Sequence, residues 1–496
     1  MARGRIVRLG ATIVSAVAVA GAGLGAAEPE GPGSAPPPTP PPSFGGIVPG
    51  LAAVAGHVPR SECGIGALVP WADRLWLISY VAHKEGTGAG TGLYEIDEGL
   101  RMRKRPESVV GTYANRFVHS ASSQLAIGPH LIDAAGGVST IDAFRSHRLA
   151  ATAAHLTAPR EKLLYLTMEG LLFEVDVRTL EARSIADAKE ALGIRGPAHF
   201  KAAATGLGRL VVANNSYAEG DVGEPGSGDG RLAEWDGKAW TVIERTAFVE
   251  VAGNGILGDA LFASGWDRAS AILMVFTRGA WTRYRLPKGT ASQDHAWFTE
   301  WPRIREVETE RLLLDLHGIF YELPALAYGG RIAGIRPIST HLRIVPDFCS
   351  WRGLLVLAGN ENSSMGDRNP VGGQPQSGLW LGKTDDLWGF GRPAGWGGPW
   401  RETAVDARLP SDPFLMTGFD RKGLHLTHDG AGPVEFTVEV DFLGDGTWNT
   451  YGKFTVAAGG YAHHEFPAGF GAHWVRVTAN RACRATAHFV YAAGGS

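Results

Sequence analysis

Residues 162–176, KLLYLTMEGLLFEVD, contain the unit that decides the fold of this chain. Lys162–Thr167 and Gly170–Asp176 are short runs dominated by apolar residues, and a tight turn is expected between them because glycine adopts backbone angles that other residues avoid. Apolar runs of this length, bounded by turn residues, are typical of β-strands. The stretch therefore predicts a pair of strands joined by a tight turn.

The same pattern recurs between about Cys63 and Trp396. We expect equivalent first strands at Arg74–Ser79, Gln124–Ile127, Arg209–Asn214, Asp259–Ser264, Arg311–Asp315 and Gly353–Ala358. They recur roughly every 40–50 residues, which is the period of four-stranded propeller blades. The sequence thus predicts an all-β fold whose main part is a seven-bladed β-propeller, with six or eight blades as the alternatives.

The pattern changes beyond about Trp400. Glu435–Phe442 and Tyr451–Val456 flank the turn Gly444–Gly446 and predict a hairpin, and two further strands follow. This alternation suits a small C-terminal β-sandwich. The predicted organisation is a signal peptide at 1–27, a Pro-rich linker at 28–45, the propeller at 46–398 and the sandwich at 399–496.

The N-terminus predicts export. Arg3, Arg5 and Arg8 precede an apolar run from Leu9 to Leu24, and small residues then suit cleavage. We expect a secreted or periplasmic protein with no stable membrane span after the signal is removed. The three cysteines, Cys63, Cys349 and Cys483, allow at most one internal disulfide; a Cys63–Cys349 bridge would join the ends of the propeller, and unpaired thiols are the favoured alternative.

The composition excludes some partners and cofactors. The net charge is −3 with 20% charged residues, so no basic excess points to nucleic acid. The sequence contains no phosphate loop in a strand-to-helix context and no zinc-site spacing. No cofactor is required by the sequence, and a bound metal, including structural Ca²⁺, is left open.

The segment Asp294–Glu306 is unusually rich in aromatic and charged residues. In an extended strand, alternate side chains share a face, and indole and guanidinium groups on one face suit a sugar ring that carries a carboxylate. Pro302 favours an edge position or a bend and so weakens this interpretation. The segment contributes these candidate residues: His295, Glu300, Trp301, Arg303 and Arg305.

Polar residues also follow several of the predicted first strands. If these strand ends converge at one mouth of a central channel, their side chains can bind a ligand together; the alternative is that they cap strands or bond neighbouring blades. The candidates of this kind are Trp266, Asp267, Arg268, Asp315, His317, Asn360 and Glu361. A second cluster contains Asn115, Arg116 and His119, and Gln376 is expected near the seventh unit.

Two reaction types suit these residues. Hydrolysis of a glycosidic bond needs two carboxyl groups or an acid and a base, and elimination beside a uronate needs a cation and a proton-transfer group. We expect His119 and His317, with His295 as a third candidate, to transfer protons, Arg303 and Arg305 to neutralise an anion, and Trp266 and Trp301 to stack on sugar. The leading hypothesis is a polysaccharide lyase or glycoside hydrolase acting on a uronate-containing or similarly decorated polysaccharide or oligosaccharide. The alternatives are a non-catalytic propeller that binds glycan or protein and, ranked lowest, an assembly scaffold.

Several motifs carry a family resemblance. Asn115–His119 (NRFVH), Gly265–Arg268 (GWDR), Arg285–Lys288 (RLPK), Trp301–Glu306 (WPRIRE) and Gln374–Ser377 (QPQS) resemble a largely uncharacterised group of exported bacterial β-propeller proteins. More distantly, the architecture resembles seven-bladed polysaccharide lyases and hydrolases acting on ulvan or on rhamnosyl-glucuronate linkages. The resemblance implies a site with His, Tyr and Arg on one face of the propeller.

Overall fold

The described part of the chain is built almost entirely from antiparallel β-sheets. The computed structural model describes residue 51 and residues 63–81, 91–216, 228–253, 260–290, 301–309, 311–327, 330–360 and 377–494. Within these ranges the helical segments are short, for example η2 (Asp142–Phe144), α1 (Ala188–Ala191) and η5 (Thr384–Gly389). None of the helices in these ranges has the length and apolar character needed to cross a membrane. The all-β prediction is confirmed.

Strands β1 to β27 form seven consecutive sheets in the described residues, each a meander in chain order. The first three contain β1 (Cys63–Trp71), β2 (Arg74–Val81), β3 (Gly92–Ile96), β4 (Met102–Lys104); β5 (Arg116–His119), β6 (Gln124–Ile127), β7 (His130–Asp133), β8 (Val138–Thr140); and β9 (Leu149–Ala154), β10 (Lys162–Thr167), β11 (Leu171–Asp176), β12 (Ala182–Asp187). The fourth and fifth contain β13 (Phe200–Gly206), β14 (Arg209–Asn214), β15 (Arg231–Trp235), β16 (Trp240–Glu244); and β17 (Ala247–Gly253), β18 (Leu261–Trp266), β19 (Ala271–Thr277), β20 (Ala280–Leu286). The last two contain β21 (Arg303–Glu308), β22 (Arg311–Leu316), β23 (Ile319–Pro324), β24 (Arg336–Thr340); and β25 (Phe348–Trp351), β26 (Leu354–Asn360), β27 (Ser377–Gly382).

Two-residue turns fix many of these hairpins. His317 and Gly318 join β22 to β23 with φ angles of 51° and 75°, and Arg352 and Gly353 join β25 to β26 with 50° and 78°. Positive φ at both central residues is the geometry whose twist matches that of antiparallel strands, and glycine at the second position adopts it without strain. The repeated X-Gly pairs in the sequence therefore mark the hairpin turns.

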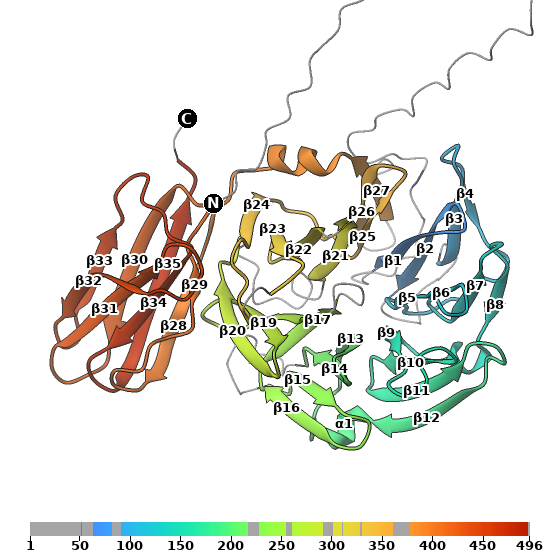
Figure 1. Ribbon diagram of the computed structural model, residues 1–496, viewed down its shortest axis with the longest axis horizontal. Helices are drawn as coiled ribbons and strands as arrows, with labels where there is room; N and C mark the ends of the chain where they lie inside the picture. The colour runs from blue at the N-terminus through green and yellow to red at the C-terminus, as the bar shows by residue number, and fades with distance from the viewer. Residues whose placement is uncertain are drawn as a thin grey trace, which may run out of the picture. The chain divides into compact units, whose positions relative to one another are not determined.

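The sheets pack against one another in a closed circuit. Each inner strand contacts the next, from β1 through β5, β9, β13, β17 and β21 to β25, and β25 contacts β1 again. The hydrophobic core is divided among the interfaces, and one cluster joins the first sheet to the last through residues such as Leu77 and Val356. Figure 1 shows these sheets arranged around a common centre, as the blades of a β-propeller are.

One part of the sequence prediction is wrong. The strands predicted to come first in each unit, such as Lys162–Thr167, are β2, β6, β10, β14, β18, β22 and β26, which are second from the centre in the order of each sheet. The innermost strands come one position earlier. Several of them carry small or charged residues in place of large apolar ones, for example FKAAATG in β13 and RIREVE in β21, so their apolar signal is weaker.

Close backbone approach holds the inner strands together at some points. A side chain on Gly66 in β1 would place its Cβ 1.9 Å from the carbonyl oxygen of Tyr113, just before the second sheet. Only glycine fits at this crossing, because the neighbouring atom is backbone and has little room to move. The first two sheets therefore approach each other more closely than side chains would allow.

The C-terminal residues form two further sets of hydrogen-bonded strands. One sheet has the order β28 (Gly395–Val405), β35 (Cys483–Ala492), β30 (Arg421–His428) and β33 (Tyr461–Glu465). The other strands, β29 (Phe414–Leu415), β34 (Trp474–Ala479), β31 (Val434–Asp441) and β32 (Asn449–Val456), continue the fifth sheet beyond β20, so that eight strands form one sheet. A separate apolar cluster, which includes Phe414, Phe436 and Phe489, lies within the C-terminal region. The hairpin predicted around Gly444–Gly446 is formed by β31 and β32.

Neither cysteine whose side chain is described is in a disulfide. Cys349 is buried and Cys483 is partly exposed, and both thiols are free. The Cys63–Cys349 bridge considered from the sequence is therefore not formed. Burial raises the pKa of Cys349 to about 12, so this thiol is protonated and unreactive.

Candidate functional site

A cavity of about 590 Å³ lies between the inner strands, and charged side chains line it. Its walls come from β1, β5, β9, β13, β17 and β21. Because three antiparallel strands separate successive inner strands, all the inner strands run in the same direction along the channel. Most of the charged residues that line it come from the beginnings or first halves of the inner strands. Together with Asp347, the residue before β25, five of them gather toward one end: Arg116, Lys201, Glu250, Arg303, Arg305 and Asp347. We call this set the channel cluster.

Arginines and carboxylates alternate in the channel cluster. Arg305 bridges two acids, with Nε 2.8 Å from Oδ1 of Asp347 and Nη1 3.1 Å from Oε1 of Glu250. Arg116 Nε lies 2.8 Å from Oδ2 of Asp347, and Arg303 Nη1 lies 3.3 Å from Oε2 of Glu250. The backbone N–H of Leu68 also donates to Asp347 over 2.8 Å. Three guanidinium groups thus share two carboxylates.

The strand geometry of β21 explains how two arginines enter the same cluster. Side chains two residues apart point to the same side of a strand. Arg303 and Arg305 both reach Glu250, whereas Ile304 between them belongs to the hydrophobic core. Pro302 precedes the strand and does not turn the two arginines outward. The shared face expected for Arg303 and Arg305 is present.

Burial and charge act against each other in this cluster. Burial acts to raise the pKa of Asp347, but Arg116 and Arg305 outweigh it and hold the pKa below its usual value. Burial lowers the pKa of Arg116 and of Arg303, whereas the carboxylates of Glu250 and Asp347 outweigh burial at Arg305 and raise its pKa. Asp347 is therefore ionised near neutral pH, and all three arginines remain cationic because their ordinary pKa lies far above 7.

Trp301 is buried beside the channel cluster. The ring lies 4.7 Å from Nζ of Lys201, 5.0 Å from the guanidinium carbon of Arg303 and 5.3 Å from the ring of Tyr80. Cations over an indole ring are stabilised by its π-electrons. Trp301 thus holds cationic groups in place, and with 3% of its surface exposed it presents no open face to a sugar.

Asn115 lies at the edge of the same cavity. Its amide group donates to the carbonyl of Gly128 over 2.9 Å and to the hydroxyl of Thr152 over 2.8 Å. Its side-chain oxygen is buried and has no hydrogen-bond partner. The amide therefore joins the second and third sheets.

His119 lies at the other end of β5 from Arg116. Three residues of extended chain separate them by roughly 10 Å. The ring nitrogens of His119 contact the hydroxyl of Ser122 at 2.6 Å and the carbonyl oxygen of Pro159 at 2.8 Å. His119 is buried and fixes the turn before β6, away from the charged end of the channel.

His317 is placed in the turn between β22 and β23 and is also buried. Its ring lies edge-on to Trp266 at 5.6 Å, and neither ring nitrogen has a hydrogen-bond partner. Burial, with a smaller contribution from Lys288, keeps the pKa of His317 well below its usual value. The ring is therefore neutral near pH 7, and it is not brought together with His119, which ends an inner strand on the opposite side of the sheets.

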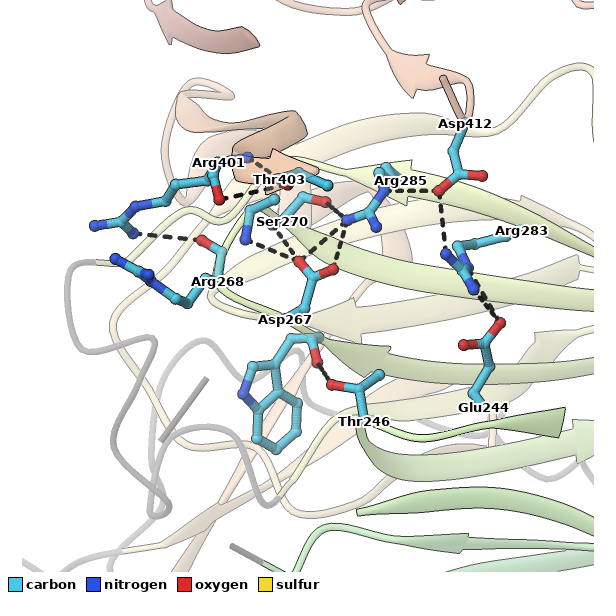
Figure 2. Close-up of polar contacts among 12 residues, drawn as sticks. Glu244, Thr246, Asp267, Arg268, Ser270, Arg283, Arg285, Arg401, Thr403 and Asp412 are labelled. Atoms are coloured by element: carbon cyan, nitrogen blue, oxygen red, sulfur yellow. Dashed lines mark hydrogen bonds and ion pairs between the residues drawn. The ribbon is translucent and has the colours of Figure 1, made fainter. Parts of the chain in front are cut away.

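Asp267 and Arg268 join the fifth sheet to the C-terminal region rather than to the channel cluster (Figure 2). Asp267 accepts two hydrogen bonds from Nη1 of Arg285, at 3.0 and 2.9 Å, and Arg285 Nε also donates to Asp412 over 2.9 Å. Figure 2 shows the series extending through Arg283 to Glu244. Burial acts to raise the pKa of Asp267, but Arg285 outweighs it and the pKa is lowered.

Asp315 forms a pair with a histidine that the sequence interpretation did not include. Nε2 of His341 lies 2.9 Å from Oδ1 of Asp315, and the imidazole ring stacks on Phe320 at 4.4 Å. His341 lines a second cavity, between the sixth and seventh sheets. Asp315 thus contributes to a different site from Arg303 and Arg305.

Four predicted residues, His295, Glu300, Glu361 and Gln376, lie outside the described residues. Asn360 ends β26 and pairs with Ser377 of β27 through the backbone. Within the described ranges, no group of three or more His, Cys, Asp or Glu side chains is arranged to hold a metal ion.

Sequence reasoning missed Lys201, Glu250 and His341 as site residues. Lys201 and Glu250 occupy inner strands, at the beginning of β13 and in the first half of β17, so a correct assignment of the inner strands would have identified them. His341 follows β24 in the connection to the seventh sheet, where no repeat position marks it.

Comparison with known proteins adds little to these observations. No family model and no curated protein matches the chain. Among solved structures, the β-propeller domain of Cps50 (Swd1) from Myceliophteria thermophila is 12% identical with a TM-score of 0.39, covering 64% of this chain and 96% of that one. The structure of U3-55K is 11% identical with a TM-score of 0.43, covering 67% and 97%. We draw no functional conclusion from likenesses this distant.

Proposed function

We propose that this protein binds a carboxylate-bearing saccharide, such as a uronate-containing polysaccharide or oligosaccharide, at the charged end of the propeller channel. The observation that carries the proposal is the channel cluster, in which the guanidinium groups of Arg116, Arg303 and Arg305 converge on only two carboxylates. A ligand carboxylate adds a third anion to this set. Guanidinium groups recognise carboxylates through paired hydrogen bonds, and a low-dielectric channel strengthens that attraction.

Binding fits the cluster better than cleavage does. A general acid must carry a proton to donate, and Asp347 is held ionised by two arginines. Glu250 likewise contacts two arginines. The predicted proton-transfer groups His119 and His317 belong to opposite ends of the sheets, and His317 is buried.

The architecture and the location belong to the same proposal. We infer that the seven sheets from β1 to β27 are the blades of a seven-bladed propeller and that β28 to β35 form a C-terminal β-sandwich. The export signal lies outside the described residues, so a secreted or periplasmic location is also proposed. An exported protein meets extracellular or cell-wall saccharides, in which uronates provide carboxylates.

Calorimetric titration with a uronate trisaccharide and with the corresponding neutral trisaccharide tests the proposal. We expect the acidic sugar to bind and the neutral sugar to bind at least 10-fold more weakly. Arg116→Gln should reduce affinity for the acidic sugar about 10- to 100-fold, since a charge-assisted hydrogen bond contributes about 1.5–3 kcal/mol. Arg145→Gln, at an exposed pair with Asp142, is the matched control and should bind like the wild type. Equal affinity for both sugars, or none for either, would overturn the proposal.

Cleavage of the bound polysaccharide, by elimination or hydrolysis, is the second candidate. Its proton-transfer group would have to come from outside the channel cluster, because the His341–Asp315 pair, which is suited to proton transfer, lines the other cavity. Ultraviolet absorbance of an unsaturated uronate would indicate elimination, and new reducing ends without that absorbance would indicate hydrolysis. Binding without either product would remove the enzymatic candidate.

A further inference from the structure

A second cavity, of about 690 Å³, opens between the sixth and seventh sheets. Its lining is mostly apolar and aromatic, and it includes Phe320, Leu342, Val345, Leu357, Trp380 and Phe390. A cavity of several hundred cubic ångströms lined in this way, with few polar groups, is typical of a small-molecule site. We call it the blade cleft.

Exposed apolar side chains border the blade cleft. Leu342 is 86% exposed and Phe390 is 40% exposed, and both line the cavity. The ring of Phe390 lies edge-on to Trp380 at 5.2 Å. Exposed aromatic and aliphatic groups gathered around a cavity mark a ligand-binding surface more often than a random part of a protein surface.

One polar side chain in the wall of the blade cleft, His341, has a ring nitrogen without a hydrogen-bond partner. The His341 side chain is 5% exposed, and its Nε2 lies 2.9 Å from Oδ1 of Asp315. Because a carboxylate only accepts hydrogen bonds, Nε2 carries the proton, and neutral imidazole then has its acceptor lone pair on Nδ1. Nδ1 of His341 is buried and has no partner. A buried acceptor without a donor costs free energy, so a ligand that supplies the donor gains affinity.

We propose that the blade cleft binds a hydroxylated aromatic compound, with its ring among the aromatic side chains and its hydroxyl donating to Nδ1 of His341. The ring requirement follows from Phe320, Trp380 and Phe390, because aromatic rings favour tilted or offset contacts with one another. The hydroxyl requirement follows from the tautomer that Asp315 selects.

This site is separate from the channel cluster, although one backbone hydrogen bond links a residue of each. The carbonyl of Asp347 accepts a hydrogen bond over 2.9 Å from the backbone N–H of Ala358, which lines the blade cleft. The ligand classes differ, because the channel cluster selects for negative charge and the blade cleft for an apolar ring with one donor. A failure of one proposal therefore leaves the other standing.

Calorimetry on the whole protein with 4-methylphenol and 4-methylanisole tests the proposal. The two probes have the same ring and oxygen, but only the phenol donates a hydrogen bond. We expect the phenol to bind about 10-fold more tightly, which corresponds to one hydrogen bond. Equal affinity, or no binding of either probe, would overturn the proposal.

Three variants locate the binding. His341→Phe keeps a ring on Phe320 and should remove most of the preference for the phenol while retaining weak binding of both probes. Ala394→Trp, at a half-buried lining position, should fill the cleft and weaken both probes at least 10-fold without touching the polar pair. Leu409→Ala, at an exposed position in the C-terminal region, is the control and should bind like the wild type. A retained phenol preference in His341→Phe, measured on protein whose thermal unfolding matches the wild type, would refute the role of His341.

Discussion

The channel cluster and the blade cleft differ in how completely their polar groups are paired. In the channel cluster, each arginine and each carboxylate has a partner of opposite charge, and Arg305 alone bridges two carboxylates. In the blade cleft, the polar pair of His341 and Asp315 lies among apolar rings, and one ring nitrogen has no partner. We therefore propose that the first site attracts its ligand through surplus positive charge, and the second through apolar surface area and one missing hydrogen bond.

This difference shows that the charged residues of a charge-rich sequence stretch should first be expected to pair with one another inside the protein, and only then to form a free binding surface. Arg303 and Arg305 were predicted to neutralise the anion of a ligand, whereas in the structure both pair with Glu250 of the neighbouring sheet. A buried ion pair contributes little net stability, but the loss of one partner is costly. The two sites should therefore respond very differently to mutation, pH and salt.

The largest effect is expected from Asp347→Ala. The substitution leaves Arg116 and Arg305 without their shared carboxylate in a buried position, and we expect the free energy of unfolding to fall by about 3–5 kcal/mol. Urea denaturation followed by tryptophan fluorescence measures the loss. Asp142→Ala removes an exposed pair and should cost at most about 1 kcal/mol. A similar small loss for Asp347→Ala would show that the cluster does not depend on its acids.

The next largest effect is a loss of folding stability at acidic pH. We expect it to arise from a buried histidine rather than from the channel cluster. Burial lowers the pKa of His130 to about 4. The unfolded chain binds this proton below about pH 6.5 and the folded chain does not until about pH 4, so stability is lost as the pH falls through this window. At pH 5 we expect His130 to cost about 2 kcal/mol relative to pH 7.5. His130→Gln should reduce that difference in urea denaturation, and an unchanged difference would exclude His130 as its source.

Salt concentration should change ligand affinity at the two sites by different, smaller amounts. Raising NaCl from about 0.05 to 0.5 M should weaken uronate binding in the channel about 3- to 10-fold, because mobile ions screen the attraction between charges. Binding of 4-methylphenol in the blade cleft should change less than 2-fold, because no net charge is involved. Calorimetry at both salt concentrations measures this, and parallel weakening of the two ligands would remove the distinction between the sites.

The smallest effect is expected from Leu342→Ala. This side chain is 86% exposed, so the substitution should change the free energy of unfolding by less than about 0.5 kcal/mol. Leu342 nevertheless lines the blade cleft, and 4-methylphenol should bind about 2- to 5-fold more weakly as its apolar contact is reduced. A loss of stability without a change in binding would mean that Leu342 supports the fold and not the ligand.

Much of the fold was predictable because it repeats. Short apolar strands recur in each sheet, X-Gly turns recur in the fourth to the seventh, and periodic local patterns such as these determine strands and hairpins directly. The order of strands within each sheet was not predictable from the same signal. The strand second from the centre is strongly apolar in most units because it packs between sheets. The inner strand faces the channel on one side and tolerates residues such as Lys201 and Glu250.

The candidate sites were only partly predictable for the same reason. Arg116, Trp301, Arg303 and Arg305 were identified by composition, and the structure places all four at or beside the channel. Their partners were not identified, because the contacts run between sheets: Asp347 lies 231 residues beyond Arg116 in the chain. His341 is visible as a site residue only after the sixth and seventh sheets are packed together. Spatial pairing across such separations has no local sequence signal.

The contact between the first and the last of the seven sheets has a consequence for folding during synthesis. The N–H of Leu68 donates to Asp347 over a separation of 279 residues. At a synthesis rate of about 5–20 residues per second, the first sheet must wait at least about 14 seconds for the residues that complete it. Until then one face of the first sheet, including Leu77, lacks its partner in the last sheet. Contacts this far apart in sequence slow folding, so a chain stopped before the seventh sheet should be prone to aggregation and to capture by chaperones.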